Sequence, residues 1–484
     1  MQFEPVIGLE VHAELQTRSK MFCACEVVDN TVAEPNIAVC PVCAGMPGTL
    51  PVVNQRAVEY ALRVALALGC EINYTSIFAR KNYFYPDLPK GYQISQYEAP
   101  LAVNGQLSIK TALGERTVRV RRVHLEEDTG KLTHVGDRES RPYSLLDLNR
   151  AGVPLLEIVS EPDMRSVEEA KAYAEGLREI LRYLEVNSGD MEKGVIRFEA
   201  NVSVREAGTD KLNTRVEIKN LNSFRALERA TEFEIARQSK VLAAGGTIEQ
   251  ETLGWDDLKE RTYSQRSKEE AHDYRYFPEP DLPPLVVENE WVEQIRANLP
   301  ELPRTKFQRF VKEYGLSEYA AGVLVAERSV AEYFENAAQT RSRKVSAKSV
   351  ANWIVGDLFA VANQTGETVA DSKVQAEALA ELVELVDGGV INQTTGKEVL
   401  MEMYSTGKRA GEIVEAKGLK QVSDVDFIAK IVSETVAENP KEVASFKAGK
   451  TGVANFLFGQ AMKKAAGKAN PAVVKTELDR QLGL

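Results

Sequence analysis

Alternating apolar and polar positions mark four segments of the chain as half-buried β-strands. In residues 6–15 the apolar side chains fall on one face and the polar side chains on the other, the pattern of a strand with one buried face. The same alternation recurs in residues 117–126, 196–205 and 214–219. Several strands that each carry a rich polar face predict an antiparallel sheet that forms a concave cradle, rather than a parallel sheet buried on both faces.

Helical periodicity accounts for most of the remaining chain. Residues 54–69 and 225–243 read as helices beside the sheet, and the periodicity becomes continuous after Trp291. After Gly407 a small basic helical module begins. We therefore predict an α+β protein with three parts: an antiparallel β-sheet cradle domain with flanking helices at residues 1–292, an all-helical domain at 293–405 and a small helical tail domain at 406–484.

The first strand carries two side chains that suit a metal ion. Glu10 and His12 are two residues apart, so the period of a strand aims both in the same direction. A carboxylate and an imidazole placed in this way can reach one divalent cation. The alternative is a strand with a solvated polar face, which is the commoner use of such a pattern.

Acidic side chains also gather at the end of the strand at residues 117–126. Glu126, Glu127 and Asp128 follow one another, and their repulsion is relieved if they share a cation; the alternative is a solvated turn. Strand parity alone aims Glu126 in the same direction as His124. Glu157 lies within an aliphatic run, where a buried carboxylate needs a cation or a hydrogen-bond donor.

Two further strands mix acids with cations and an amide on their polar faces. Such faces suit the binding of phosphates beside a metal. The candidate ATP- or phosphate-binding residues are Arg197, Glu199, Asn201, Arg205 and Lys219, with Glu199 also a candidate metal ligand.

Charge and hydropathy bear on the compartment and the partners of the protein. The formal net charge of the 484 residues is −11, which argues against a chain that coats nucleic acid through its global charge. A local basic patch remains compatible with RNA binding. No apolar run reaches membrane-spanning length and no signal peptide precedes the first strand, so we expect a cytoplasmic protein that does not associate with membranes. The tail supplies the candidate patch: Lys447, Lys450, Lys463, Lys464 and Lys468.

Four of the five cysteines form two closely spaced pairs. Cys23 and Cys25 precede Cys40 and Cys43, an arrangement typical of a tetrahedral structural zinc site with a closed coordination shell. The alternatives are two disulfides, which a reducing cytosol disfavours, or unrelated buried thiols. Cys70 stands alone and is expected in the core.

Seven long stretches, in the same order, resemble the B subunit of the bacterial tRNA-dependent amidotransferases (GatCAB) over essentially the whole chain. They are Val6–Glu14 (VIGLEVHAE), Lys81–Gln96 (KNYFYPDLPKGYQISQ), His124–Lys131 (HLEEDTGK), Asp147–Asp163 (DLNRAGVPLLEIVSEPD), Phe198–Val202 (FEANV), Glu217–Phe224 (EIKNLNSF) and Asp273–Leu282 (DYRYFPEPDL). The tail is similar to the YqeY-like module that ends this family. Some members of the family lack the cysteine cluster, so zinc would serve the scaffold rather than the reaction.

The resemblance implies an ATP-dependent ligase that acts on mischarged tRNA. ATP would phosphorylate the side-chain carboxylate of Glu-tRNA(Gln), of Asp-tRNA(Asn) or of both, and ammonia would then displace the phosphate. Phosphoryl transfer requires Mg²⁺ or Mn²⁺, and the resemblance places this metal on Glu10, His12, Glu127 and Glu157. Because strand parity favours Glu126 over Glu127, both remain candidates. The tail lysines would contact the tRNA.

The same resemblance implies a heterotrimer. A separate amidase subunit, GatA, would release ammonia from glutamine, and the small GatC would bridge the two. Ammonia would reach this subunit through a channel whose mouth is assigned to Lys81, Tyr83, Lys90 and Glu127. Two other classes remain open: a tRNA-binding accessory subunit without its own chemistry, and a metal-dependent phosphohydrolase.

Overall fold

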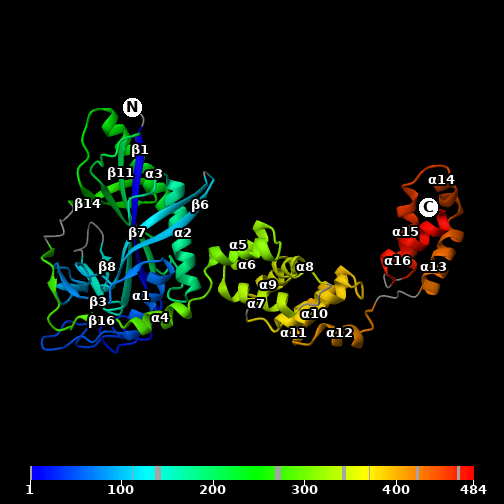
Figure 1. Ribbon diagram of the computed structural model, residues 1–484, viewed down its shortest axis with the longest axis horizontal. Helices are drawn as coiled ribbons and strands as arrows, with labels where there is room; N and C mark the ends of the chain where they lie inside the picture. The colour runs from blue at the N-terminus through cyan, green and yellow to red at the C-terminus, as the bar shows by residue number, and fades with distance from the viewer. Residues whose placement is uncertain are drawn as a thin grey trace. The chain divides into compact units, whose positions relative to one another are not determined.

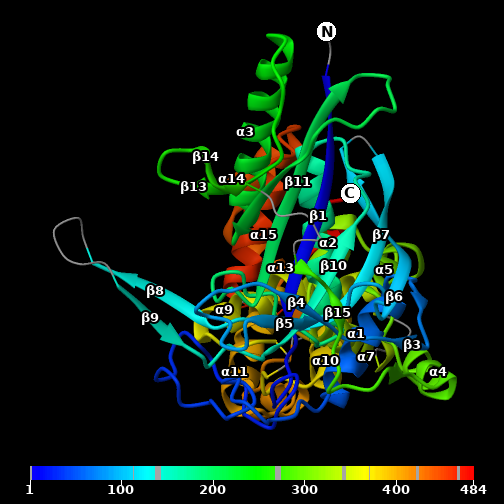
Figure 2. The ribbon, with the colours of Figure 1, turned by 90° about the vertical axis from the view of Figure 1, so that its left-hand side faces the viewer.

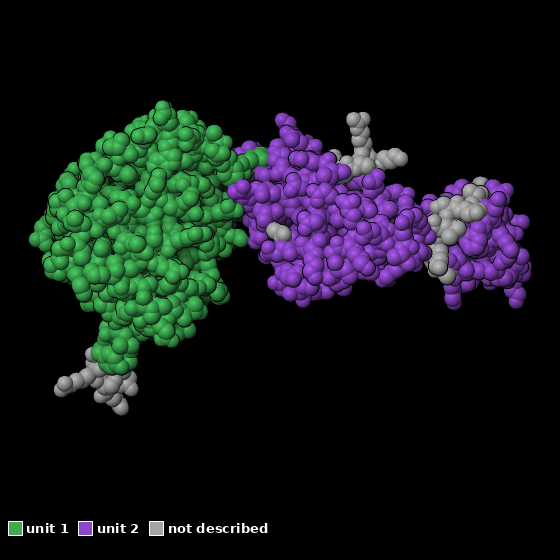
Figure 3. Space-filling view, turned by 90° about the horizontal axis from the view of Figure 1, so that it is seen from below, with its two compact units in different colours: residues 1–302 green, residues 303–484 purple. Residues whose placement is uncertain are grey.

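The structure, a computed structural model, describes residues 3–112, 114–136, 143–267, 274–340, 345–369, 371–420, 425–465 and 469–483. The chain divides into two compact units, residues 1–302 and residues 303–484 (Figure 3). Among the described residues, no helix combines the length and the apolar character needed to cross a membrane.

A nine-stranded sheet organises the first unit, and its first strand is central. β1 (Phe3–Glu14) lies between β11 and β10, as Figure 2 shows. Neighbouring strands are antiparallel except β12 and β13, which pair in parallel. The order across the sheet is β14 (Arg261–Ser267), β13 (Glu251–Asp256), β12 (Val216–Leu221), β11 (Ile196–Glu206), β1, β10 (Pro154–Ser160), β7 (Gly114–Glu127), β6 (Ala102–Thr111) and β2 (Glu71–Ile72). The α+β fold class is confirmed, and all four predicted strands belong to this sheet.

Three helices bury the apolar face of the sheet. They are α1 (Gln55–Ala67), α2 (Val167–Tyr183) and α3 (Phe224–Ala243), and Figure 1 shows α2 and α3 along one side of the strands. Asn54, Ser166 and Ser223 cap the three helices with side-chain oxygens that accept backbone N–H groups of the first turn. Because the helices cover one face, the acidic side chains of the strands are left on the other.

Short strands lie beside the open face. β4 (Ala79–Asn82) pairs with both β5 (Tyr92–Ser95) and β15 (Phe277–Pro278), and β3 (Thr75–Ser76) pairs with β16 (Leu285–Val286). Ser95 and Ile94 of β5 donate hydrogen bonds to Glu126 and Glu127 of β7, which fixes the small sheet against the large one. The hairpin of β8 (Lys131–Val135) and β9 (Tyr143–Asp147) projects from the unit in Figure 2.

The described part of the second unit is helical and contains two separate hydrophobic cores. The first core spans residues 310–414 and the second spans residues 428–482. The helices are α5 (Pro303–Glu313), α6 (Glu318–Val325), α7 (Arg328–Thr340), α8 (Ala347–Asn352), the π-helix η2 (Trp353–Leu358), α9 (Phe359–Thr365), α10 (Ala376–Asp387), α11 (Gln393–Thr406), α12 (Ala410–Ala416), α13 (Val425–Glu438), α14 (Pro440–Lys447), α15 (Val453–Lys464) and α16 (Pro471–Leu482).

At each predicted boundary, a helix that lies partly or wholly beyond the boundary still packs in the core on its N-terminal side. α4 (Asn289–Ala297) crosses residue 292, and its Val292 and Ile295 are buried in the core of the first unit. The two compact units therefore divide at residues 302 and 303. α12 lies beyond residue 406, yet its Ile413 and Val414 belong to the core of residues 310–414.

Candidate active site

Strand register places the predicted residues of the site in two rows that run across the strands of the sheet, each made of directly opposed residues. His12 of β1 is directly opposite Glu157 of β10, and Glu157 is opposite His124 of β7. On the other side of β1, Glu10 is opposite Glu199 of β11. Directly opposed residues of antiparallel strands have Cβ atoms about 4.5–5.5 Å apart, so these side chains converge without any loop to hold them.

The first row forms a cluster of imidazole and carboxylate groups. His12 Nε2 lies 3.5 Å from Glu157 Oε2 and 3.7 Å from Glu126 Oε1. His124 Nε2 lies 3.2 Å from Glu157 Oε2. Burial disfavours the imidazolium, but the hydrogen bond and charge of Glu157 outweigh it and raise the pKa of His12 to about 9. Burial alone would raise the pKa of Glu157, yet the two histidines hold it well below its ordinary value.

The second row forms a cluster of three carboxylates, Glu10, Glu199 and Glu217. Burial, and then the charges of Glu157 and Glu199, raises the pKa of Glu10. For Glu199 burial is outweighed by Lys219, whose Nζ donates to it at 2.9 Å, and the pKa falls to about 2. The carboxylates of this face thus repel one another, and Lys219 relieves only part of the repulsion.

Both clusters fit a hard divalent cation. The potential ligand atoms of His12, Glu126 and Glu157 all lie within 4.8 Å of one another, as do those of Glu10, Glu199 and Glu217. In addition, Nδ1 of His12, Nδ1 of His124 and Oδ1 of Asn201 are buried without a hydrogen-bond partner. Carboxylate-rich sets of oxygen ligands suit Mg²⁺ and Mn²⁺. Such an ion would offset the repulsion between the acids.

The adjacent glutamates of the acidic run point to different places. Glu126 lies near His124, as strand parity indicated, and also near His12 of β1. Glu127 instead accepts hydrogen bonds from Lys90 Nζ and from the Ile94 N–H, the latter at 2.9 Å. The structure therefore brings Glu126, and not Glu127, into the cluster with Glu157.

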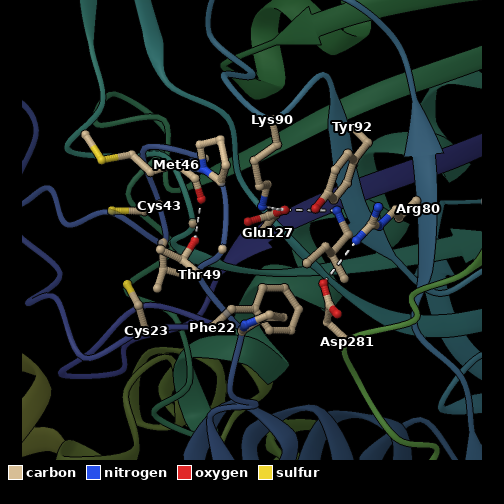
Figure 4. Close-up of a pocket in the computed structure, with 17 residues that line it drawn as sticks. Phe22, Cys23, Cys43, Met46, Thr49, Arg80, Lys90, Tyr92, Glu127 and Asp281 are labelled. Atoms are coloured by element: carbon tan, nitrogen blue, oxygen red, sulfur yellow. Dashed lines mark hydrogen bonds and ion pairs between the residues drawn. The ribbon is translucent and has the colours of Figure 1, made fainter.

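Glu127 and Lys90 line a separate cavity of about 230 Å³. Figure 4 shows the two side chains pointing toward one another on one side of this cavity, with Cys23 and Cys43 on the other. Arg80 and Asp281 form an ion pair at its rim, at 3.3 Å. Among the four residues that the resemblance assigns to an ammonia channel, Lys90 and Glu127 line this cavity, whereas Lys81 and Tyr83 do not.

The predicted phosphate-binding cations already have acidic partners. Arg197 donates to both oxygens of Asp128, at 3.0 and 3.3 Å. Arg205 donates to Glu4 at 2.6 Å, near the start of β1 and away from both clusters. Among the predicted phosphate ligands, Glu199 belongs to the second cluster. Lys219 and Asn201 contact this cluster directly, and Asn201 Nδ2 donates to Glu10 at 2.8 Å.

The four clustered cysteines are arranged to hold a metal ion. Their sulfur atoms lie within 4.8 Å of one another, and none of the four forms a disulfide. Cys43 Sγ is 3.8 Å from Cys40 Sγ and 4.0 Å from Cys25 Sγ. Tetrahedral zinc with Zn–S bonds of about 2.3 Å would place its sulfurs about 3.8 Å apart. Lys20, fully buried, points its ammonium at Cys43 at 3.6 Å and so offsets thiolate charge.

The tail lysines differ in their surroundings. Lys447 ends α14, and Lys450 follows it in the loop before α15; both are exposed. Lys463 is exposed at the end of α15, and the neighbouring Lys464 pairs with Glu434 and Glu438, at 2.8 and 2.6 Å. Lys468 lies outside the described residues.

Sequence reasoning did not assign roles to several residues of the site. Glu217 alternates with buried residues on β12, so the parity that selected Lys219 could also have found it. His124 was placed by parity but given no role. Lys20 gave no local signal, because its partners come from distant parts of the chain. Asp128 was noticed only as part of the acidic run, and its partner Arg197 came with the fold.

One face of this sheet carries imidazole and carboxylate groups that could hold a metal ion. The family profile "GatB/GatE catalytic domain" matches residues 5–293, and the profile "GatB domain" matches residues 332–482.

Three relatives are each named as the B subunit of aspartyl/glutamyl-tRNA(Asn/Gln) amidotransferase. The protein of Persephonella marina is 52% identical over 482 residues and covers 100% of both chains. That of Thermodesulfovibrio yellowstonii is 52% identical over 98% of both chains, and that of Thermoanaerobacter pseudethanolicus is 50% identical over 100% of both. The chain therefore belongs to the GatB family of amidotransferase B subunits.

Proposed function

We propose that this chain is the subunit that activates and amidates the misacylated amino acid of Glu-tRNA(Gln), of Asp-tRNA(Asn) or of both. The carboxylate oxygen of the substrate attacks the γ-phosphorus of ATP, an O–P bond forms and ADP leaves. Ammonia then attacks the acyl carbon, the C–O bond to phosphate breaks, and the nitrogen loses a proton as the amide forms. The observation that carries the proposal is the convergence of two acidic clusters on one sheet face.

The two clusters are the proposed sites for Mg²⁺ or Mn²⁺. His12, Glu126 and Glu157 would hold one ion, and Glu10, Glu199 and Glu217 would hold another. When bound, such ions neutralise the charge that develops on the transferred phosphoryl group. Within the chain, His124 fixes the orientation of Glu157, while Asn201 fixes that of Glu10.

Lys219 is the proposed protein contact to the phosphates of ATP. It is drawn toward the face by Glu199 and Glu217, at 2.9 and 3.6 Å. Burial disfavours its ammonium, but Glu199 and Glu217 together outweigh burial and raise the pKa of Lys219, so the side chain carries its positive charge at neutral pH. Arg197, which is held by Asp128, supports the scaffold of the site in this proposal.

Ammonia must come from a partner in this proposal. Dissolved ammonia is largely protonated at neutral pH and then lacks the lone pair that attacks the acyl carbon, so delivery from an amidase subunit (GatA) avoids exposure to water. GatC would bridge the two subunits. The cavity beside Lys90 and Glu127 is the proposed point of entry, because its lining includes both the exposed Met46 and Glu127 at the end of β7.

Two further roles complete the proposal. The cysteine cluster would bind structural Zn²⁺, since four thiolates leave no open coordination position for chemistry. Lys447, Lys450 and Lys463 would contact tRNA phosphates, a sequence-independent contribution that weakens as salt rises. Because the substrates are tRNAs charged for translation, we place the reaction in the cytoplasm.

The test is a reconstituted complex of this chain with its amidase and bridging partners. We expect ADP formation that requires both a divalent ion and the misacylated tRNA, with amidated tRNA produced in equal amount. ADP formation at the same rate without tRNA would instead indicate a phosphohydrolase. Binding of tRNA without ADP formation would indicate an accessory subunit.

A further inference from the structure

The segment at residues 274–286 provides the edge strand, β15, of the small sheet that carries Lys81. β15 pairs with β4 in a register that sets Phe277 opposite Arg80. The side chain of Asn82 also reaches this segment, since its Nδ2 donates to the carbonyls of Tyr274 and Arg275 at 3.1 and 2.8 Å. Residues almost two hundred positions apart in the chain are thereby fixed against one another on both sides of Lys81.

A buried ion pair anchors the same segment. Arg80 donates to both carboxylate oxygens of Glu279, at 2.7 Å each, and the Glu279 side chain is fully buried. The guanidinium of Arg80 also stacks over the ring of Tyr92, 4.2 Å from its centroid. Bidentate, charge-assisted contacts of this kind fix geometry as well as adding stability.

Two tyrosine rings lie beside the Lys81 ammonium, and a third packs against one of them. Nζ lies 5.0 Å from the ring centroid of Tyr274 and 5.9 Å from that of Tyr83. The ring of Tyr276 packs edge-on against Tyr274 at 6.1 Å and stacks on Tyr97 at 4.2 Å, within 10° of parallel. We call Tyr83, Tyr274 and Tyr276 the tyrosine cage.

The backbone between the two tyrosines of the segment is strained. Arg275 has a φ of +46°, a left-handed conformation that non-glycine residues rarely adopt. This bend lies between Tyr274 and Tyr276, whose rings touch. Strained backbone of this kind persists where the surrounding structure holds it, and it concentrates at functional sites.

The acids of the first cluster help to keep the Lys81 side chain protonated. Burial disfavours its charge, but Tyr276 and then Glu126 outweigh burial and raise the pKa of Lys81 well above its ordinary value. Glu157 contributes in the same direction. The strand pairing agrees with this, because β4, which carries Lys81, pairs with β5, and Ser95 of β5 donates to Glu126.

Building on the amidotransferase activity proposed above, we propose that Tyr274, braced by Tyr276, is a positioning residue that holds the Lys81 ammonium on the side of β4 where it meets the phosphate of the activated substrate. The faces of the rings attract the cation, and an ammonium held in a desolvated site stabilises negative charge without having to reorganise. The aromatic ring carries this effect, so phenylalanine is expected to replace tyrosine.

A double-mutant cycle between Tyr274 and Lys81 tests the inference. In the reconstituted complex, supplied with ATP, glutamine and misacylated tRNA, we expect Tyr274→Leu to lower the rate of amidation at least tenfold and Tyr274→Phe to stay within threefold of wild type. In the Lys81→Met background, Tyr274→Leu should cause no further loss, because the group that it positions is gone. Losses that add in the double variant, or a Tyr274→Leu complex as active as wild type, would overturn the inference.

Tyr276, which packs against Tyr274, gives a second cycle with Lys81 and the same expected pattern. If a thermal melt shows that Tyr274→Leu does not fold, the cycle between Tyr276 and Lys81 tests the role of the cage in its place. A wild-type complex without ATP-dependent amidation would refute the proposed function itself. An active wild-type complex with additive cycles at both tyrosines would refute only the role of the cage.

Discussion

The imidazole of His12 and the carboxylate of Glu157 face each other across two adjacent strands, paired in register and 3.5 Å apart. One residue comes from the first strand of the chain, and the other lies 145 positions later. Because register alone sets this pair, a shift of one residue in either strand would aim one of the two side chains into the core. The chemistry of the site therefore depends on the accuracy of strand pairing at the centre of the sheet.

Adjacent glutamates of β7 should differ sharply in metal binding. We expect Glu126→Gln to weaken the affinity for Mn²⁺ at least tenfold, because it removes a ligand of the first cluster. Glu127→Gln is a matched control, since Glu127 is equally buried, at 3% exposure, but pairs with Lys90. Calorimetric titration of both variants with Mn²⁺ checks this. The reverse order of effects would move the metal site to Glu127.

Glu10 should be required for activation but not for ammonia release. In the reconstituted complex we expect Glu10→Gln to reduce amidation at least a hundredfold, while glutamine hydrolysis by the partner stays measurable. Glu4→Gln, on the same strand but paired with Arg205, serves as the control and should retain activity. Unchanged amidation in the Glu10 variant would remove this residue from the site.

The pair of Asp128 and Arg197 should contribute strongly to stability. Both side chains are largely buried, at 4% and 18% exposure, so Asp128→Asn leaves the Arg197 guanidinium with the more distant carboxylate of Glu14, 4.0 Å away. We expect the free energy of unfolding to fall by about 3 kcal/mol. Asp163→Asn breaks the pair with Arg119, which is 68% exposed, and should cost less than about 1 kcal/mol. Denaturant titrations measure both values, and equal effects would contradict the prediction.

The cysteine cluster should contain metal in the purified protein. We expect Cys40→Ser to abolish stoichiometric zinc in elemental analysis and to lower the free energy of unfolding of the first unit by more than about 2 kcal/mol, because the metal closes a loop that has little core of its own. Cys70→Ala is the control, since Cys70 is buried outside the cluster. Wild-type protein that carries no metal and is unaffected by chelators would argue against the site.

Removal of the tail should weaken the binding of tRNA without unfolding the rest of the chain. We expect a chain truncated after Lys420 to keep the core of residues 310–414 and to lose affinity for tRNA at least tenfold at low salt. A chain truncated after Thr406 also loses α12, whose Ile413 and Val414 are buried, and should melt at a lower temperature. Filter binding measures the affinity for tRNA, and thermal melts measure the stability of each truncated chain. If the chain truncated after Lys420 bound tRNA as tightly as the full chain, the role of the tail would be refuted.

Residues on regular strands could be predicted well from the sequence, because side chains alternate along a strand and every second residue therefore lies on the same face. That rule placed Glu10 with His12 and Glu126 with His124, and it would have identified Glu217. It could not pair one strand with another, so the partners of Arg197 and Arg205 came only with the fold. The tyrosine cage lies in a segment without periodicity, and amphipathic helices such as α4 and α12 do not state which core they cover.

The central position of β1 also affects how the protein is made. Its partners, β10 and β11, begin at residues 154 and 196, so about 140 residues must be translated after β1 before the first of its neighbours follows. At elongation rates of about 5–20 residues per second, that delay lasts roughly 7–28 s. During this time an aliphatic segment is exposed on the nascent chain, as a ready substrate for ribosome-associated chaperones.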